Sequence, residues 1–292
     1  MNRVRAARTL ARMSLHGAIA AAVTPMRDGG EALDGEAFAP LVGFLAHGGV
    51  DGLLALGTTG EGVLLSMAER RWAAERFVEA RPDGFRVAVH CGAQTTHETV
   101  GLSAHAREIE ADAVAVIAPP YYPLDDNELF AHLRGVADAC SPVPFYVYEF
   151  AARSGYAIPV SVIERLRSEV PNLRGLKVSD RPWAQVAPYL LDGLDLFVGS
   201  EPLVVEGLEA GATGAVSGLG AAFPGIVSRL VHERDPAAHE RVVALRTGLA
   251  GVPFIAAMKS VLAARGVLPH ADVRPPLRGL TEAELARVVG LS

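Results

Sequence analysis

The sequence predicts a (β/α)₈ barrel that carries a helical appendage at its C-terminal end. Three observations support this prediction: eight short apolar runs, helical spacing of apolar residues between them, and reactive residues just past the ends of several runs. Half of the 292 residues are hydrophobic, which is enough for a large core. An α/β barrel of about 250 residues forms one domain, so the length does not require two.

The eight runs are rich in Val, Ile, Leu and Ala, and several are bounded by Gly or Pro. Short, nearly continuous apolar runs are typical of parallel strands that are buried on both faces. We expect strands at 18–23, 52–56, 85–89, 113–118, 143–148, 173–178, 194–198 and 214–217.

Between the runs, apolar residues recur at i, i+3 and i+4, which indicates amphipathic helices. We expect helices at 38–46, 67–79, 96–109, 127–139, 159–167, 183–190 and 202–210. Strict alternation of strands and helices predicts a parallel sheet. Right-handed crossovers permit either a closed barrel or an open doubly wound sheet, and the placement of the candidate site residues favours the barrel.

After residue 235 the pattern changes, because helical segments at 237–249, 255–265 and 281–289 follow one another without a strand. We therefore divide the chain into an N-terminal extension (1–14), a barrel (15–235) and a C-terminal helical domain (236–292). The extension is rich in arginine and lacks the apolar stretch of a secretory signal. A short disordered extension or an over-long start is the simplest interpretation, and an organelle-targeting role is the alternative.

Composition excludes several classes of function. The net charge of −6 offers no broad attraction for nucleic acid or anionic membranes, and no run approaches the roughly 18 apolar residues of a membrane span. Cys91 and Cys140 lie far apart, so we expect no disulfide framework or zinc finger and a cytoplasmic location. His90 ends an apolar run and is either a ligand or base, or a structural histidine at a barrel end.

Lysine is the most informative residue type in the chain. Of the 27 Lys and Arg residues only two are lysines, Lys177 and Lys259. Lysine can form an imine and arginine cannot. Lys177 lies near the C-terminal end of the sixth predicted strand and shares a face with Gly175. It is either a buried nucleophile or a strand-end lysine in solvent, and spacing alone leaves both open; Lys259, on an appendage helix, is interpreted as structural.

A glycine-rich motif, Gly57-Thr58-Thr59-Gly60-Glu61, follows the second predicted strand directly. Glycines at both ends permit a tight turn that exposes backbone N–H groups. Such groups, together with the threonine hydroxyls, suit a carboxylate ligand. The alternative is an ordinary loop between a strand and a helix.

Three of the six tyrosines fall at two strand ends: Tyr121 and Tyr122 after the fourth strand, and Tyr148 at the end of the fifth. A tyrosine hydroxyl can relay protons, although wall and interface aromatics are the commoner role. Together, Thr58, Tyr122, Tyr148 and Lys177 lie at C-terminal strand ends, which is the face where barrel enzymes keep their active sites.

At this point the chain resembles the dihydrodipicolinate synthase / N-acetylneuraminate lyase family of pyruvate-dependent class I aldolases, over about residues 15–285. The resemblance rests on an ordered set of segments rather than on any single motif. These segments are 22–25 (AVTP), 57–61 (GTTGE), 120–122 (PYY), Tyr148, 175–177 (GLK), 211–217 (GATGAVS) and 274–277 (RPPL).

The resemblance implies a role for each candidate. Lys177 would form the imine with pyruvate, Tyr148 would transfer protons, and Thr58 and Tyr122 would complete a proton relay. The substrate-binding residues would be Gly57, Thr59, Arg153 and Val216. The Tyr122 equivalent reaches a neighbouring subunit in the synthases, so a homotetramer or homodimer is implied. No metal or organic cofactor is implied, because the imine itself is the electron sink.

Three functions remain open. Arg153, five residues after Tyr148, matches an arginine that binds the acceptor carboxylate in the synthases and favours L-aspartate semialdehyde, which gives 4-hydroxy-tetrahydrodipicolinate in lysine biosynthesis. Glu149 departs from the family pattern and is expected to bond sugar hydroxyls. It motivates a catabolic aldolase that cleaves a 2-keto-3-deoxy sugar acid or a 4-hydroxy-2-oxo acid. The third hypothesis is a 2-oxo acid sensor without turnover, against which the intact set of reactive residues argues.

Overall fold

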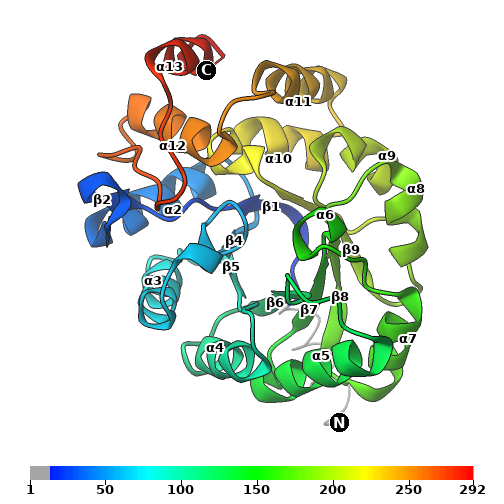
Figure 1. The fold of residues 1–292 in the computed structure, drawn as a ribbon. Helices are drawn as coiled ribbons and strands as arrows, with labels where there is room; N and C mark the ends of the chain where they lie inside the picture. Colours follow the sequence, from blue (N-terminus) through cyan, green and yellow to red (C-terminus); the bar gives the residue numbers. More distant parts are fainter. Residues whose placement is uncertain (1–13, 292) are drawn as a thin grey trace.

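The computed structural model describes residues 14–291, and within them eight parallel strands close into a barrel (Figure 1). The predicted N-terminal extension, 1–14, lies almost entirely outside the described residues. Around the barrel the strand order is β1-β10-β9-β8-β7-β6-β5-β4, with β1 paired to β4. The barrel strands are β1 (Gly17–Ala21), β4 (Gly52–Ala55), β5 (Arg86–His90), β6 (Ala113–Ile117), β7 (Phe145–Glu149), β8 (Leu173–Val178), β9 (Asp195–Val198) and β10 (Gly214–Ser217).

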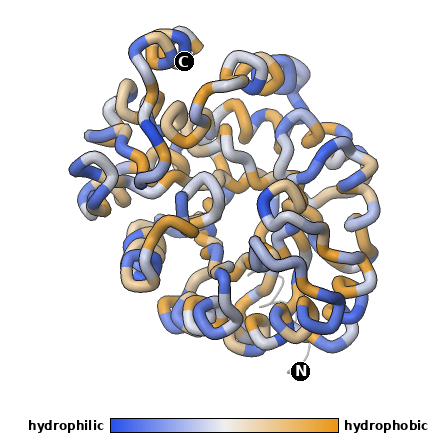
Figure 2. The backbone as a smooth tube through the Cα atoms, viewed as in Figure 1, coloured by the Kyte–Doolittle hydropathy of each residue, from blue (hydrophilic) through white to orange (hydrophobic). Residues whose placement is uncertain are grey.

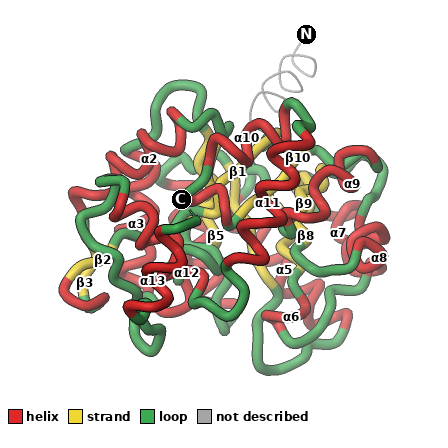
Figure 3. The backbone as a smooth tube through the Cα atoms, turned by 90° about the horizontal axis from the view of Figure 1, so that it is seen from above, coloured by secondary structure: helices red, strands yellow, loops and turns green. Residues whose placement is uncertain are grey.

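Helices surround the strands, as the view in Figure 3 shows. The helices around the barrel are α2 (Phe38–His47), α3 (Met67–Glu79), α4 (Thr96–Glu108), α5 (Asp126–Cys140), α6 (Ala151–Ser154), α7 (Val160–Glu169), α8 (Trp183–Val186), α9 (Val204–Glu209) and α10 (Pro224–His232). Three further helices follow: α11 (Pro236–Gly248), α12 (Phe254–Ala264) and α13 (Glu282–Val289). None of the described helices is long and apolar enough to cross a membrane.

The predicted barrel is therefore confirmed, and each of its strands begins and ends within two residues of the expected position. Local signals explain several helix starts. Ser66 and Glu69 form a reciprocal capping box at the start of α3, and Asp125 and Glu128 form one at the start of α5.

Four elements of the structure were not predicted from the sequence pattern. Met26–Arg27 (β2) and Ala32–Leu33 (β3) form a short antiparallel pair, and α6 and α10 were not expected. Two-residue strands and a four-residue helix are too short to show a periodic pattern, which explains three of the four omissions.

The apolar residues form two separate cores, one on each face of the strands. Successive residues of a strand are therefore both apolar, which explains the continuous apolar runs in the sequence. One core lies between the strands and the helices. The second fills the barrel lumen, while hydrophilic segments lie mainly at the periphery (Figure 2). The lumen residues are Leu15, Ile19, Ala21, Leu54, Ala88, Ala113, Ala115, Tyr146, Phe197 and Val216.

Candidate active site

Lys177 and Tyr148 lie side by side at the C-terminal end of the lumen. They are direct partners in the register between β8 and β7, and both share a face with the lumen residues of their strands. The Lys177 Nζ atom is 4.0 Å from the centroid of the Tyr148 ring. Lys177 is 6% exposed and Tyr148 2%, so the interpretation of Lys177 as a solvent-facing strand-end residue is wrong.

The layer below this pair closes the barrel. The Tyr146 hydroxyl donates to Asp195 at 3.0 Å and accepts from the Leu15 backbone N–H at 3.2 Å. Burial raises the pKa of both Tyr146 and Asp195, with the Asp195 carboxylate adding to the shift of Tyr146. Gly175 lies in this layer, where a Cβ atom would approach the Asp195 carbonyl oxygen to 2.1 Å. Glycine is thus needed for the close approach of β8 and β9 directly below Lys177.

The glycine-rich loop after β4 reaches over the same end of the lumen. The Thr58 hydroxyl lies 3.3 Å from the Tyr148 hydroxyl, close enough for a hydrogen bond in either direction. Thr58 is exposed, whereas Gly57 and Thr59 are buried. Among the described residues, no hydrogen bond uses the backbone N–H of Thr58 or Thr59. The predicted carboxylate-binding groups are therefore free to bind a ligand.

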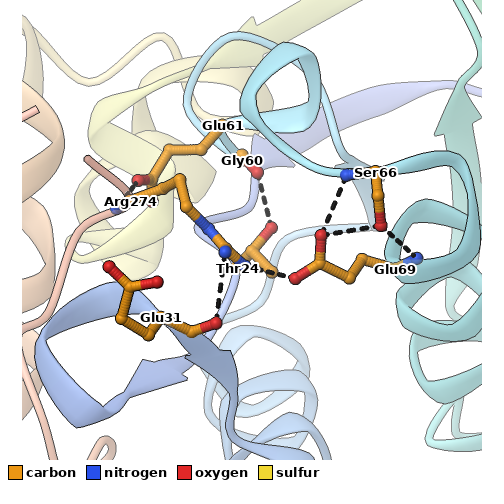
Figure 4. A network of polar contacts seen from close by, with 7 residues as sticks. All are labelled: Thr24, Glu31, Gly60, Glu61, Ser66, Glu69 and Arg274. Atoms are coloured by element: carbon orange, nitrogen blue, oxygen red, sulfur yellow. Dashed lines mark hydrogen bonds and ion pairs between the residues drawn. The ribbon is translucent and has the colours of Figure 1, made fainter. Parts of the chain in front are cut away.

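The loop is held from behind by buried polar contacts (Figure 4). Thr24, just after β1, donates to the Gly60 carbonyl at 2.6 Å, and Glu61 accepts from the Arg274 backbone N–H at 2.7 Å. The other Glu61 oxygen lies 2.6 Å from the Lys259 Nζ atom. Burial lowers the pKa of Lys259, and Glu61 opposes this shift. Lys259 thus contacts the loop from α12.

His90, at the end of β5, completes the wall beside Tyr148. The two rings meet edge to face, with centroids 5.9 Å apart. Burial, together with the positive charges of Arg70 and Lys177, lowers the pKa of His90 to about 3. The imidazole is therefore neutral at physiological pH, and the Ile117 backbone N–H lies 3.4 Å from its Nε2 atom.

The segment that follows Tyr148 brings an aromatic ring and a cation to the mouth of the barrel. The Phe150 ring stacks on Tyr148 with centroids 6.2 Å apart. Arg153, on the short helix α6, is exposed, and its guanidinium lies 5.8 Å from the Phe150 ring centroid. Within residues 14–291 no carboxylate forms an ion pair with Arg153. The cation is therefore available to an anionic ligand.

Glu149 faces away from the lumen, since strand neighbours alternate and Tyr148 faces inward. It is 1% exposed and accepts from the Ile158 backbone N–H at 2.9 Å. Burial raises the pKa of Glu149 to about 8, and the nearby Asp180 carboxylate adds to the shift. The expectation that Glu149 bonds sugar hydroxyls is wrong for this geometry, because its carboxyl is buried behind the strand.

Two other candidates, Val216 and Tyr122, make no hydrogen bond, ion pair or ring contact with the Lys177–Tyr148 pair among the described residues. Val216 contributes its side chain to the lumen core and is 4% exposed. Tyr122 is 71% exposed and packs edge to face on Tyr121 at 4.9 Å. No described contact joins Tyr122 to Thr58 or Tyr148. Its role in a relay stays a prediction that needs a second subunit.

A closed eight-stranded barrel with a buried lysine, a tyrosine and a threonine at its C-terminal end is the arrangement expected of a lyase of the class I aldolase type. Sequence comparison gives the family directly, because the model of the dihydrodipicolinate synthetase family matches residues 14–291. The chain belongs to this family. The described residues contain no group of three or more His, Cys, Asp or Glu side chains that could hold a metal ion.

Individual relatives carry different names. An uncharacterized DapA-like lyase of Halobacterium salinarum is 33% identical over 283 residues, which are 94% of this chain and 92% of that protein. N-acetylneuraminate lyase of Rattus norvegicus is 34% identical over 210 residues, 69% of this chain and 65% of that protein. The crystal structure of dihydrodipicolinate synthase from Aquifex aeolicus superimposes with a TM-score of 0.88 at 25% identity, covering 95% of this chain and 97% of that one. The family is thus clear, and the substrate is not fixed by these names.

The sequence pattern indicates no role for Glu61, although Glu61 lies in the glycine-rich motif, and it predicts a structural role for Lys259 outside the site. The scarcity of lysine was the available signal, because both lysines of the chain lie at the site. Lys259 contacts Glu61 of the glycine-rich loop, and Lys177 contacts Tyr148 in the lumen. Alternation from Ala88 could likewise have placed His90 in the lumen.

Proposed function

We propose that Lys177 forms a Schiff base with pyruvate and that the resulting enamine adds to L-aspartate semialdehyde, giving 4-hydroxy-tetrahydrodipicolinate. The observation that carries the proposal is the contact of a buried lysine amine with the ring of Tyr148, whose hydroxyl meets that of Thr58. A lysine amine can form an imine with the carbonyl of a 2-oxo acid.

The chemistry follows from these groups. The Lys177 amine attacks the C2 carbonyl of pyruvate, and loss of water leaves a protonated imine. Removal of a C3 proton gives the enamine, whose C3 forms the new carbon–carbon bond with the aldehyde carbon. The aldehyde oxygen takes up a proton, and the amino group of the semialdehyde then attacks the imine carbon. This step closes the ring and releases the Lys177 amine, so the only water lost is the one from imine formation. Tyr148, paired with Thr58, lies where it can pass these protons.

The free N–H groups of Thr58 and Thr59 support a site for the pyruvate carboxylate. Arg153 supports an acceptor with its own carboxylate, because a guanidinium binds carboxylates through paired hydrogen bonds. L-aspartate semialdehyde has such a group. We propose that it extends from the imine past Phe150 towards Arg153.

A second candidate is the cleavage of N-acetylneuraminate or of a 2-keto-3-deoxy sugar acid to release pyruvate. It is favoured by the 34% identity to a protein named N-acetylneuraminate lyase. It loses the support of Glu149, which is buried behind β7. Both reactions share the same pyruvate imine, so they differ only in the acceptor half of the site.

The decisive experiment is borohydride reduction with pyruvate, followed by peptide mass mapping of the wild type and of Lys177→Ala. Because the chain has only one other lysine, Lys259, the position of any adduct is unambiguous. A pyruvate adduct on the Lys177 peptide, absent from the variant, supports the proposal. A folded wild type without an adduct refutes the aldolase mechanism and favours a 2-oxo acid sensor.

Product assays then separate the candidates. Consumption of L-aspartate semialdehyde with pyruvate supports the synthase. Pyruvate release from N-acetylneuraminate or 2-keto-3-deoxy sugar acids, without aldehyde consumption, supports the cleavage reaction.

A further inference from the structure

The glycine-rich loop is held by residues from the C-terminal part of the chain. One Glu61 carboxylate oxygen lies 2.6 Å from the Lys259 Nζ atom, and both side chains are fully buried. The other oxygen accepts the Arg274 backbone N–H, 213 positions along the chain. Both oxygens of one loop carboxylate are therefore engaged by the C-terminal part of the chain.

Glu61 has a left-handed backbone conformation, with a φ of 57°. A residue with a side chain adopts this conformation at a cost and keeps it where the surroundings hold it. The Glu61 backbone N–H donates to the Thr58 carbonyl at 3.3 Å, and that of Gly62 donates to the Gly57 carbonyl at 3.3 Å. The Glu61 side chain thus anchors the residue that closes the turn around Thr58 and Thr59.

The partners of Glu61 are themselves fixed. Lys259 also donates to the Asp272 carbonyl at 2.6 Å. The Arg274 side chain forms an ion pair with Glu69 at the start of α3 and donates to the Glu31 carbonyl at 3.2 Å (Figure 4). The anchor is therefore a rigid extension of the helical domain rather than a loose surface contact.

A buried ion pair is weak evidence of stabilisation by itself, because desolvation opposes the attraction and apolar replacements are often as stable. The loop that this pair holds is the one whose Thr58 hydroxyl meets the Tyr148 hydroxyl and whose Thr58 and Thr59 backbone N–H groups make no hydrogen bond among the described residues. Small displacements of groups that orient a substrate have large effects on binding and rate. This placement argues for a role in substrate binding.

We propose that Glu61 and Lys259 are positioning residues that set the Thr58–Thr59 loop for the carboxylate of the 2-oxo acid. The C-terminal helical domain is then part of the active-site architecture, although it supplies no group that touches the substrate. The inference rests on the proposed function, because it assumes that this loop binds the carboxylate of pyruvate.

The test measures the pyruvate concentration that gives half-maximal borohydride trapping on Lys177. Glu61→Gln keeps an acceptor for Arg274 but removes the charge, and Glu61→Gln/Lys259→Met removes both buried charges at similar volume. In both variants we expect the half-saturating pyruvate concentration to rise about ten- to hundredfold. The adduct at saturating pyruvate should remain on Lys177.

Asp112→Asn is the matched control. Asp112 is buried and pairs with Arg81 at 2.6 Å and Arg86 at 3.0 Å, at the opposite end of the barrel, before β6. It should lower the melting temperature without changing the pyruvate dependence more than about twofold, since it lies far from the loop.

A folded double variant with the wild-type pyruvate dependence would overturn the inference. So would a double variant that does not fold, because the pair would then hold the fold rather than the loop. Absence of an adduct in the wild type would instead refute the proposed function, which keeps the two failures distinct.

Discussion

The Thr58 hydroxyl, on the loop after β4, lies 3.3 Å from the Tyr148 hydroxyl at the end of β7. These residues are 90 positions apart in the chain and belong to strands that are not neighbours in the barrel. The Tyr148 ring also lies 4.0 Å from the Lys177 Nζ atom. A single hydroxyl pair thus joins the expected carboxylate loop to the expected proton-transfer group.

Tyr148→Phe should lower turnover by about 10²- to 10⁴-fold, the usual contribution of a positioned acid–base group. The phenyl ring keeps its packing against Lys177, so the fold and pyruvate binding should persist. Steady-state turnover and the rate of deuterium exchange at the pyruvate methyl group measure the effect. Unchanged exchange would show that another group moves the C3 proton.

Arg153→Ala should raise the KM for the acceptor aldehyde about ten- to hundredfold and leave that for pyruvate unchanged. This range corresponds to the roughly 1.5–3 kcal/mol of a hydrogen bond to a charged group. Arg134→Ala, an exposed arginine on α5, is the control. If the aldehyde kinetics of the Arg153 variant matched those of the control, the assignment of Arg153 to the acceptor carboxylate would be wrong.

Glu149→Gln should remove a pH dependence of stability. Burial raises the pKa of Glu149 to about 8, compared with about 4.3 in an unfolded chain. Between these values the folded state binds more protons than the unfolded state, so the wild-type free energy of unfolding falls as pH rises.

Glutamine resembles the protonated acid. The free energy of unfolding of the variant should therefore be close to that of the wild type near pH 5 and larger than that of the wild type at pH 8. The gain in the free energy of unfolding at pH 8 should be on the order of 3–4 kcal/mol, measured by urea unfolding. Glu164→Gln, at an exposed site on α7, is the control and should give no such gain. Parallel stability profiles of wild type and Glu149→Gln would contradict the prediction.

Gly175→Ala should destabilise the barrel by about 1–3 kcal/mol, because its Cβ atom would lie 2.1 Å from the Asp195 carbonyl oxygen. The same displacement of β8 should reduce borohydride trapping at Lys177. Gly135→Ala, in α5 with no atom near its Cβ position, should be neutral or stabilising by up to about 1 kcal/mol. A stable Gly175 variant with full trapping would show that β8 can shift without cost.

Much of this architecture was readable from local patterns. The eight strands follow from apolar runs, and the candidate residues follow from their position at the ends of those runs, because parallel strands of a barrel bring their C-terminal ends to one face. Alternation along the strand predicted that Lys177 and Gly175 share one face of β8. In the structure this face is the one that lines the lumen, which confirms the prediction. The short elements β2, β3 and α6 could not be predicted, because they contain too few residues to show a periodic pattern of apolar side chains.

The sequence by itself determined the barrel, the order of its strands along the chain, and the residue types available at one end of the lumen. Only the tertiary structure decided which of them meet. It joined Glu61 to Lys259 and turned Glu149 away from the lumen. It also placed Arg153 against the Phe150 ring, with no carboxylate partner among residues 14–291. The physical reason is that a strand pattern gives the face of each residue, whereas contacts between distant loops depend on barrel closure and on the packing of the C-terminal helices. These long-range contacts are what turn a set of reactive residues into a site.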